Sequence, residues 1–163
     1  MKKIKVVALG LAMAVAMTFV GCNKNKEVVS SGKVSADQPG WKANAENPVK
    51  FDWYINFSWF ARHWGDSKVS KYITEKTGVD VNFIVPAGNE AEKLNAMIAG
   101  DALPDLITLG WWEGQIPMMI DSDLIYALDE LATEYDPYFF KVADKDKLGW
   151  YRQDNGHFYG YPN

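Results

Sequence analysis

The sequence predicts an α/β domain in which a parallel central sheet is covered by helices. Three short segments rich in β-branched and aromatic residues, at 50–56, 79–85 and 105–109, indicate strands. Two segments with apolar residues at helical spacing lie between them. Strands that alternate with helices in this way form parallel sheets, because each helix carries the chain back to start the next strand.

The first strand, 50–56, leads into an aromatic stretch, 57–65, that has no clean period and therefore indicates a loop. Asp66 or Ser67 can cap the helix that follows, and Gly78 supplies the residue that ends it. This helix carries its apolar side chains on one face: Val69, Tyr72 and Ile73.

The second strand, 79–85, is followed by a second helix, 90–99, which ends at Gly100. The third strand, 105–109, is nearly all apolar. The apolar residues of the second helix recur at helical spacing: Ala91, Leu94, Met97 and Ile98.

The carboxyl-terminal third has a less regular pattern. Short helices are expected around 129–135 and 137–145. The dipeptide Asn155-Gly156 lies between two alternating runs, and a type I′ turn needs positive φ at both of its central residues, which Asn and Gly tolerate. The sequence therefore predicts a terminal β-hairpin.

The amino terminus has the features of an export signal. Three lysines precede an apolar run, 6–20, which is shorter than the roughly 20 residues that a membrane-spanning helix needs. The run closes on Gly21 and on Cys22, the only cysteine. This ending resembles the bacterial lipobox, with Phe19 where Leu is usual, and implies removal of a lipoprotein signal peptide, 1–21, and a diacylglyceryl group on Cys22. The alternative is a plain secretory signal followed by an incidental cysteine.

Residues 22–48 are polar, rich in Ser, Asn, Lys, Gly and Pro, and show no sustained period. Such a stretch buries too little apolar surface to offset the entropy lost on ordering. We therefore expect a flexible tether that joins the lipidated Cys22 to a domain over 49–163.

Charge and cysteine content exclude two classes of protein. Removal of the signal takes away three of the 17 Lys and Arg residues and none of the 21 Asp and Glu residues, so the formal net charge moves from −4 to −7. An acidic surface does not suit nucleic acid, whose binding depends on clustered basic residues. A single cysteine cannot form an internal disulfide, so the exported domain depends on its core.

Three segments, 73–86, 93–108 and 154–163, resemble in order and spacing the amino-terminal lobe of the extracellular solute-binding proteins of family 1. They contain a helix-Gly-strand unit, a Gly-Asp-x-x-Pro-Asp-hydrophobic run and an Asn-Gly-x-x-Tyr-Gly-x-Pro run. The resemblance covers 51–163, with small departures at Ala102 and His157.

These relatives are lipoprotein receptors of carbohydrate ABC importers, with a periplasmic-binding-protein-like fold of two α/β lobes around a cleft. The resemblance implies that this chain is the first lobe only, an amino-terminal fragment or a truncated gene product. It implies a monomer, anchored by lipid outside the bacterial cell membrane, that captures an oligosaccharide and passes it to permease subunits. Neither enzyme activity nor a cofactor is expected.

In open parallel sheets, ligands bind beyond the carboxyl ends of the strands, which here are the loops at 56–65 and 110–114. Rigid aromatic rings suit the flat C–H faces of sugars, and polar neighbours can orient the hydroxyl groups. The alternative is that the rings pack against the sheet or between lobes. The expected ligand-binding residues are Asn56, Ser58, Trp59, Trp64, Trp111 and Trp112, with Arg62 and Glu113 as polar neighbours.

Other chemistries have weaker support. The segment from Asp144 resembles a calcium loop but lacks an oxygen ligand at Leu148 and a glutamate at Asn155. His63 and His157 lack metal-ligand spacing, so no metal is expected. No nucleophile elbow and no phosphate-binding loop is present. The alternative functions are a lipid-anchored carbohydrate-active hydrolase, which would need a carboxylate pair or a triad, and a surface adhesin or structural lipoprotein.

Overall fold

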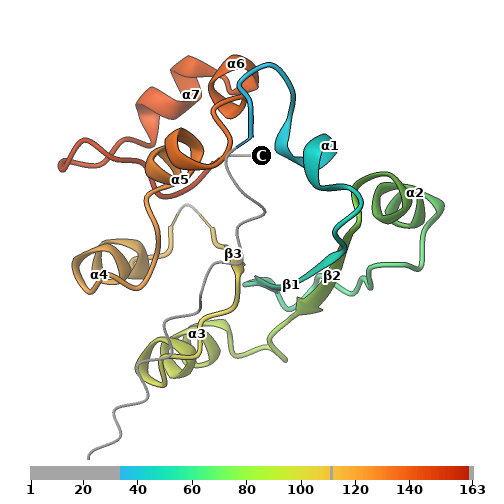
Figure 1. Cartoon of the computed structure of the whole chain (residues 1–163). Helices are drawn as coiled ribbons and strands as arrows, with labels where there is room; N and C mark the ends of the chain where they lie inside the picture. Colours follow the sequence, from blue (N-terminus) through green and yellow to red (C-terminus); the bar gives the residue numbers. More distant parts are fainter. Residues whose placement is uncertain (1–33, 111, 162–163) are drawn as a thin grey trace, which may run out of the picture.

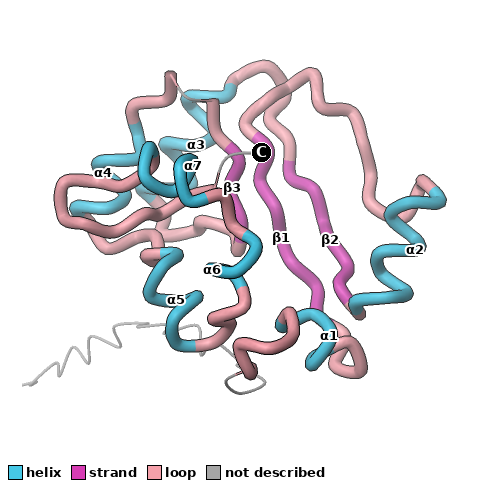
Figure 2. The backbone as a smooth tube through the Cα atoms, turned by 90° about the horizontal axis from the view of Figure 1, so that it is seen from above, coloured by secondary structure: helices cyan, strands magenta, loops and turns pink. Residues whose placement is uncertain are grey.

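The computed structural model describes residues 34–110 and 112–161 of the 163-residue chain. Its three strands, β1 Val49–Ile55, β2 Val79–Ile84 and β3 Leu106–Thr108, form a parallel sheet in the order β2-β1-β3. The central strand β1 lies between β2 and β3 (Figure 2). It aligns Val49 with Val79 and Trp53 with Leu106. The parallel sheet predicted from the sequence is therefore confirmed.

The two crossover helices, α2 Lys68–Thr77 and α3 Glu90–Ala99, also match the prediction. Of the two candidate caps for α2, Ser67 is the one used, because its hydroxyl accepts the backbone N–H of Ser70 at 3.0 Å. Gly78 ends α2 in the left-handed conformation, with φ of 71°, and donates its N–H to Thr74 at 2.9 Å.

The core lies between the sheet and α3. Tyr54 of β1 packs with Leu94 and Met97, which share one face of α3, and all three are buried. The partly buried residues that surround them are Ile84, Ile98, Leu103, Ile107 and Leu109. Figure 1 shows α3 close to the sheet on the side of β3, and α2 on the opposite side of the molecule.

Four short helices follow β3: α4 Gln115–Asp121, α5 Leu128–Glu134, α6 Phe139–Val142 and α7 Lys145–Trp150. In Figure 1, α5, α6 and α7 form a group next to one another. The helix expected at 129–135 is confirmed as α5. The one expected at 137–145 is interrupted: α6 ends at Val142, and α7, which was not predicted, begins at Lys145. Asp144 explains the division, because its carboxylate accepts the N–H groups of Asp146 and Lys147 and so begins a new helix.

The prediction of a terminal β-hairpin is wrong, because the described residues 151–161 contain no strand. Gly156 has φ of 87°, but Asn155 does not share its positive φ, so a type I′ turn is not formed. The Asn155 side chain instead accepts the N–H of His157 at 3.1 Å, which makes a local turn. Phe158 is then buried, and its carbonyl accepts the N–H of Leu128 at 2.7 Å.

The described part of the expected tether, residues 34–48, differs from the expectation. It contains α1 Gly40–Asn44 and contacts the end of α5: Val34 donates its N–H to Tyr135 at 2.9 Å, and Gly40 donates to Oδ2 of Asp136 at 2.9 Å. These acceptors lie about 100 residues away in the sequence, so composition alone could not reveal them. We call residues 34–48 the amino-terminal strap.

Residues 1–33 and Trp111 lie outside the described residues, and with them the signal, Cys22 and the first part of the tether. None of the helices in the described ranges is long and apolar enough to cross a membrane.

Candidate functional site

The loops after β1 and β3 meet at the carboxyl edge of the sheet, because these two strands are neighbours. Asn56, the first residue after β1, donates its N–H to the carbonyl of Thr108 at 3.0 Å. The two loops lie at the upper end of the sheet in Figure 2. The strand order thus brings together two segments that are more than 50 residues apart.

Three aromatic rings from these loops form a group that we call the aromatic platform: Phe57, Trp59 and Trp112. Phe57 stacks on Trp59 with ring centroids 5.5 Å apart and an interplanar angle of 25°. Its centroid lies 6.1 Å from that of Trp112. Trp59 is 75% exposed and Trp112 is 62% exposed, so the platform offers large apolar rings to solvent. An exposed aromatic group of this kind suits the apolar face of a ligand.

Gly110 makes room for the platform at the end of β3. A Cβ atom at this position would lie 2.5 Å from the Trp112 ring, so any larger residue would displace the indole. The Gly110 carbonyl also accepts the N–H of Glu113 at 3.1 Å, which folds the loop back on itself. Local backbone geometry therefore sets the position of both Trp112 and Glu113.

A buried polar chain links the core to the loop after β3. The hydroxyl of Tyr54 donates to Oδ1 of Asn56 at 2.6 Å, and Nδ2 of Asn56 donates to Oε1 of Glu113 at 2.9 Å. Burial, together with the charges of Glu90 and Glu113, raises the pKa of Tyr54 to about 12. The phenol is therefore a stable donor at neutral pH.

The loop after β1 is also attached to α3. Ser58 donates its N–H to Oε1 of Glu90, in the first turn of α3, at 3.0 Å. Hydrogen bonds from the side chain and the backbone of Ser58 hold the pKa of the Glu90 carboxyl below its usual value. This attachment fixes the backbone just before Trp59.

The structure does not bring all of the expected ligand-binding residues together. Trp64 is half-buried: its indole N–H donates to Oγ1 of Thr74 at 2.8 Å, and its ring contacts Phe83 with centroids 6.0 Å apart. For Trp64 the alternative of packing against the sheet fits best. Asn56 is only 1% exposed and lies beneath the surface, and Trp111 lies outside the described residues.

Two residues of the site were not among those expected from the sequence. Phe57 is the ring on which both exposed tryptophans meet, and its position two residues before Trp59 in the same loop was the available signal. Glu90 anchors the loop from α3, and nothing local in the sequence indicates that its carboxylate reaches Ser58.

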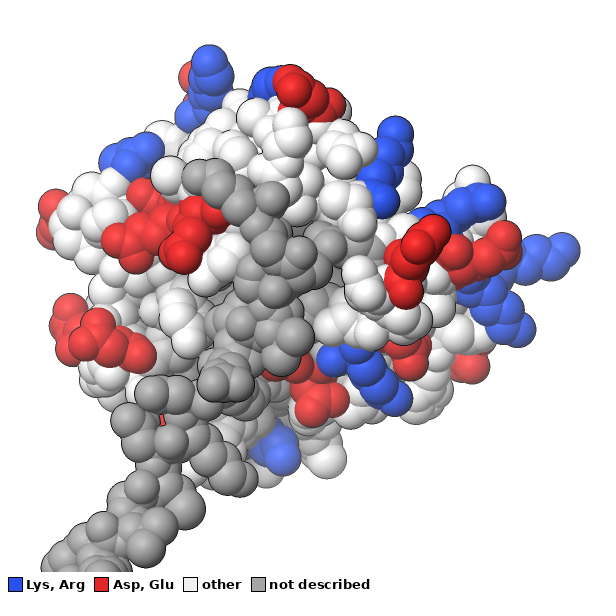
Figure 3. Space-filling model, in the orientation of Figure 1, with Lys and Arg blue, Asp and Glu red and all other residues white. Residues whose placement is uncertain are grey.

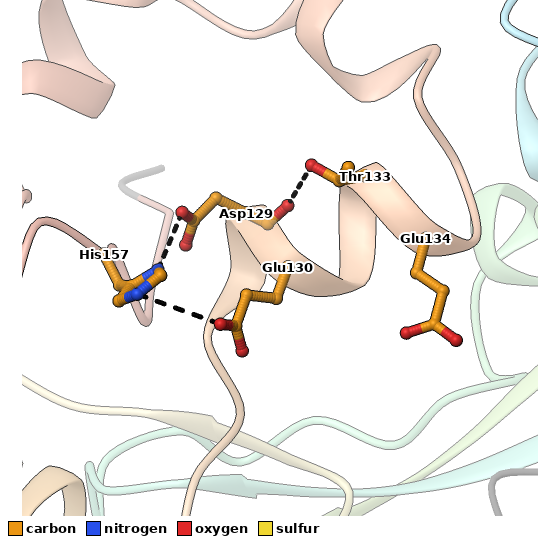
Figure 4. A pocket seen from close by; sticks show the side chains of 5 residues that line it. All are labelled: Asp129, Glu130, Thr133, Glu134 and His157. Carbon is orange, nitrogen blue, oxygen red and sulfur yellow. Dashed lines mark hydrogen bonds and ion pairs between the residues drawn. The ribbon is translucent and has the colours of Figure 1, made fainter.

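A separate hollow of about 480 Å³ lies on α5, away from the platform. Figure 4 shows that His157 points toward Asp129 and Glu130 at its edge. Figure 3 shows that acidic side chains gather on the side of the molecule that carries α4 and α5. Within residues 34–110 and 112–161, no group of three or more His, Cys, Asp or Glu side chains could hold a metal ion. The residues that line the hollow are Asp129, Glu130, Thr133, Glu134 and His157.

The parallel sheet covered by helices places the chain in the periplasmic-binding-protein-like α/β class. The model of the bacterial extracellular solute-binding protein family matches residues 65–162, which is more than half of the sequence, and the chain belongs to this family. The family predicted from the three sequence segments is thereby confirmed.

Two solved structures of the Streptococcus pneumoniae ABC-transporter substrate binding protein FusA are similar to this chain. One is an EF-hand mutant in complex with fructo-nystose, with a TM-score of 0.52 and 16% identity. The other is a complex with kestose, with a TM-score of 0.51 and 20% identity. In both comparisons the match covers 68% of this chain and 23% of the FusA chain. Because the identities are low, the likeness shows the fold alone. No curated protein matches the sequence significantly.

Proposed function

We propose that this chain supplies one wall of the carbohydrate-binding site of an extracellular ABC-importer receptor. The observation that carries the proposal is the aromatic platform, which stands at the carboxyl edge of the sheet beside the buried chain from Tyr54 to Glu113. Family membership supports a binding protein rather than an enzyme. The ligand is an oligosaccharide, and the receptor delivers it to permease subunits in the membrane.

The chemistry of the platform suits a sugar. A sugar ring has one face of C–H groups, which packs on an indole or a phenyl ring, and a rim of hydroxyl groups, which needs hydrogen-bonding partners. Trp59 and Trp112 provide the first, with 75% and 62% of their surfaces exposed. Glu113, next to Trp112, provides a carboxylate that accepts hydroxyl donors.

The location follows from the signal and the family together. Three lysines, a short apolar run and Gly21 before Cys22 support export followed by lipid attachment. We therefore propose that the receptor works as a monomer on the extracytoplasmic face of the membrane, held by acyl chains on Cys22, with residues 49–163 as its first lobe.

Binding and turnover measured together test this function. We expect titration calorimetry of the receptor that contains this chain as its first lobe, with kestose, nystose and maltotriose, to show saturable binding of at least one sugar. Chromatography of the same mixtures after prolonged incubation should show each sugar intact. Hydrolysis of a sugar would favour the lipid-anchored hydrolase instead, and absence of binding across a broad oligosaccharide panel would contradict a receptor role.

A further inference from the structure

We propose that Glu113 is the residue that accepts hydrogen bonds from the ligand's hydroxyl groups, and that Asn56 contributes to binding only by positioning Glu113. This inference rests on the proposed function and deepens it. It also reassigns Asn56, which the sequence alone placed among the residues that touch the ligand.

Asn56 cannot reach a ligand in this arrangement. Its side chain is 1% exposed, and both ends of its amide are engaged. A carboxylate can only accept hydrogen bonds, so the group that faces Glu113 at 2.9 Å must be the NH₂ of Asn56. Oδ1 then faces Tyr54 at 2.6 Å, and the tyrosine hydroxyl must donate to it. The chain of donors therefore runs in one direction, from Tyr54 to Glu113.

Glu113 is placed to make the contact that Asn56 cannot make. It is partly exposed and follows Trp112 of the aromatic platform directly. Its Oε1 accepts from Asn56, and its backbone N–H is bound to Gly110. Among the described residues, Oε2 of Glu113 has no hydrogen-bond partner. A carboxylate held at one oxygen and open at the other matches neutral hydroxyl groups, which are donors.

The amide at position 56 matters electrostatically. An aspartate there would have the same shape but would put a second carboxylate 2.9 Å from Glu113. Two carboxylates at this distance cannot both be ionised, and they hold one proton between them more tightly than either would alone. Asn56→Asp should therefore disturb Glu113 at neutral pH and restore a hydrogen bond when the shared proton binds at lower pH.

Kestose is the first probe, with nystose and maltotriose beside it. We expect Glu113→Gln to lower the affinity at least tenfold for the sugar that the wild type binds. We expect Asn56→Asp to lower the affinity for the same sugar at least tenfold at pH 7.5. At pH 5 the variant should regain most of this affinity, whereas the affinity of the wild type changes little between the two pH values. Thermal melting of Asn56→Asp at both pH values separates this positioning effect from a loss of folding at pH 7.5.

Asn82→Asp is the matched control. Asn82 is exposed on β2, and its Nδ2–H donates to Oδ1 of Asp52 at 2.9 Å. Asn82→Asp therefore also places two carboxylates close together, but outside the platform. The affinity of the Asn82→Asp variant for the sugar should equal that of the wild type at both pH values.

The outcomes separate the two proposals. A wild type that binds none of the three sugars, nor any of a wider panel, overturns the proposed function and this inference with it. A wild type that binds, together with a folded Glu113→Gln variant of unchanged affinity, overturns only the inference. Thermal melting of each variant establishes folding, and Glu113→Gln, at a partly exposed position, decides the question if Asn56→Asp does not fold.

Discussion

Nδ1 of His157 lies 3.0 Å from Oδ2 of Asp129, and this contact joins the carboxyl-terminal segment to α5. The other carboxylate oxygen of Asp129 accepts the N–H of Phe158 at 3.2 Å. Burial acts to raise the pKa of Asp129, but the hydrogen bonds from His157 and Phe158 outweigh it and hold the pKa below its usual value. The folded state therefore favours the ionised carboxylate.

Asp129→Asn should lower the free energy of unfolding by about 1–2 kcal/mol at pH 7, because charge-assisted hydrogen bonds are lost. Because the pKa of Asp129 is lower in the folded state than in the unfolded state, the ionised carboxylate stabilises the fold at pH values above the unfolded-state pKa of about 3.9. This stabilisation is lost as the pH falls through the folded-state pKa. Urea unfolding at pH 7 and at pH 3 should therefore show the difference between wild type and variant shrinking at pH 3. Glu130→Gln, whose side chain is 67% exposed and 3.8 Å from His157, should show little effect.

Gly78→Ala should destabilise the domain by about 1–3 kcal/mol, because φ is 71° and a Cβ atom would lie 2.7 Å from the carbonyl oxygen of Ala45. Urea unfolding measures the change. Gly114→Ala is the control, since its φ is −82° and a Cβ atom there meets no described atom within 4 Å. Equal effects at both positions would contradict the close approach of residues 45 and 78.

Removal of a platform ring should weaken sugar binding. Trp59→Ala and Trp112→Ala should each raise the dissociation constant by roughly fivefold to twentyfold, about 1–2 kcal/mol, as measured by calorimetry with the sugar that the wild type binds. Trp150→Ala removes an even more exposed indole, at 82%, from α7 and should leave affinity unchanged. Unchanged affinity in both platform variants would place the site elsewhere.

The amino-terminal strap should resist proteolysis. Limited digestion is expected to leave a product that begins near residue 34, since Val34 and Gly40 are both bound to the end of α5. Asp136→Ala removes the acceptor of Gly40 and should move the start of the product toward residue 48. Asp121→Ala, an exposed carboxylate on α4, is the control. A wild-type product that already begins near residue 48 would favour the flexible tether.

Cys22→Ser should release the protein from the membrane, because the apolar run 6–20 is shorter than a spanning helix and the proposed attachment is through acyl chains on Cys22. Fractionation of cells followed by detection of the protein measures the release. A serine variant that stays in the membrane fraction as firmly as wild type would argue against lipid attachment.

The sequence predicted the elements that local patterns determine. Gly78 and Gly100 end their helices where expected, and β-branched runs form the three strands, because capping and periodicity act over a few residues. Where a distant partner decides the conformation, the prediction was wrong: Phe158 binds to α5 instead of a hairpin partner, and Val34 binds to Tyr135.

The same distinction applies to the site. The loops themselves could be predicted, since the carboxyl edge of a parallel sheet is set by strand order. The role of each ring could not, because exposure depends on neighbours. Trp64 donates a hydrogen bond to Thr74 and packs on Phe83. Trp59 and Trp112 both contact Phe57 and remain exposed.

Tyr54 belongs to two systems at once. Its ring is part of the buried cluster with Leu94 and Met97, and its hydroxyl begins the chain that ends at Glu113. A sugar that engages Glu113 would therefore steady the packing of α3, a helix whose core residues it does not touch. Amide hydrogens of α3 should then exchange more slowly with deuterated solvent when the sugar is bound, so that the helix packed on the core reports events at the carboxyl edge of the sheet.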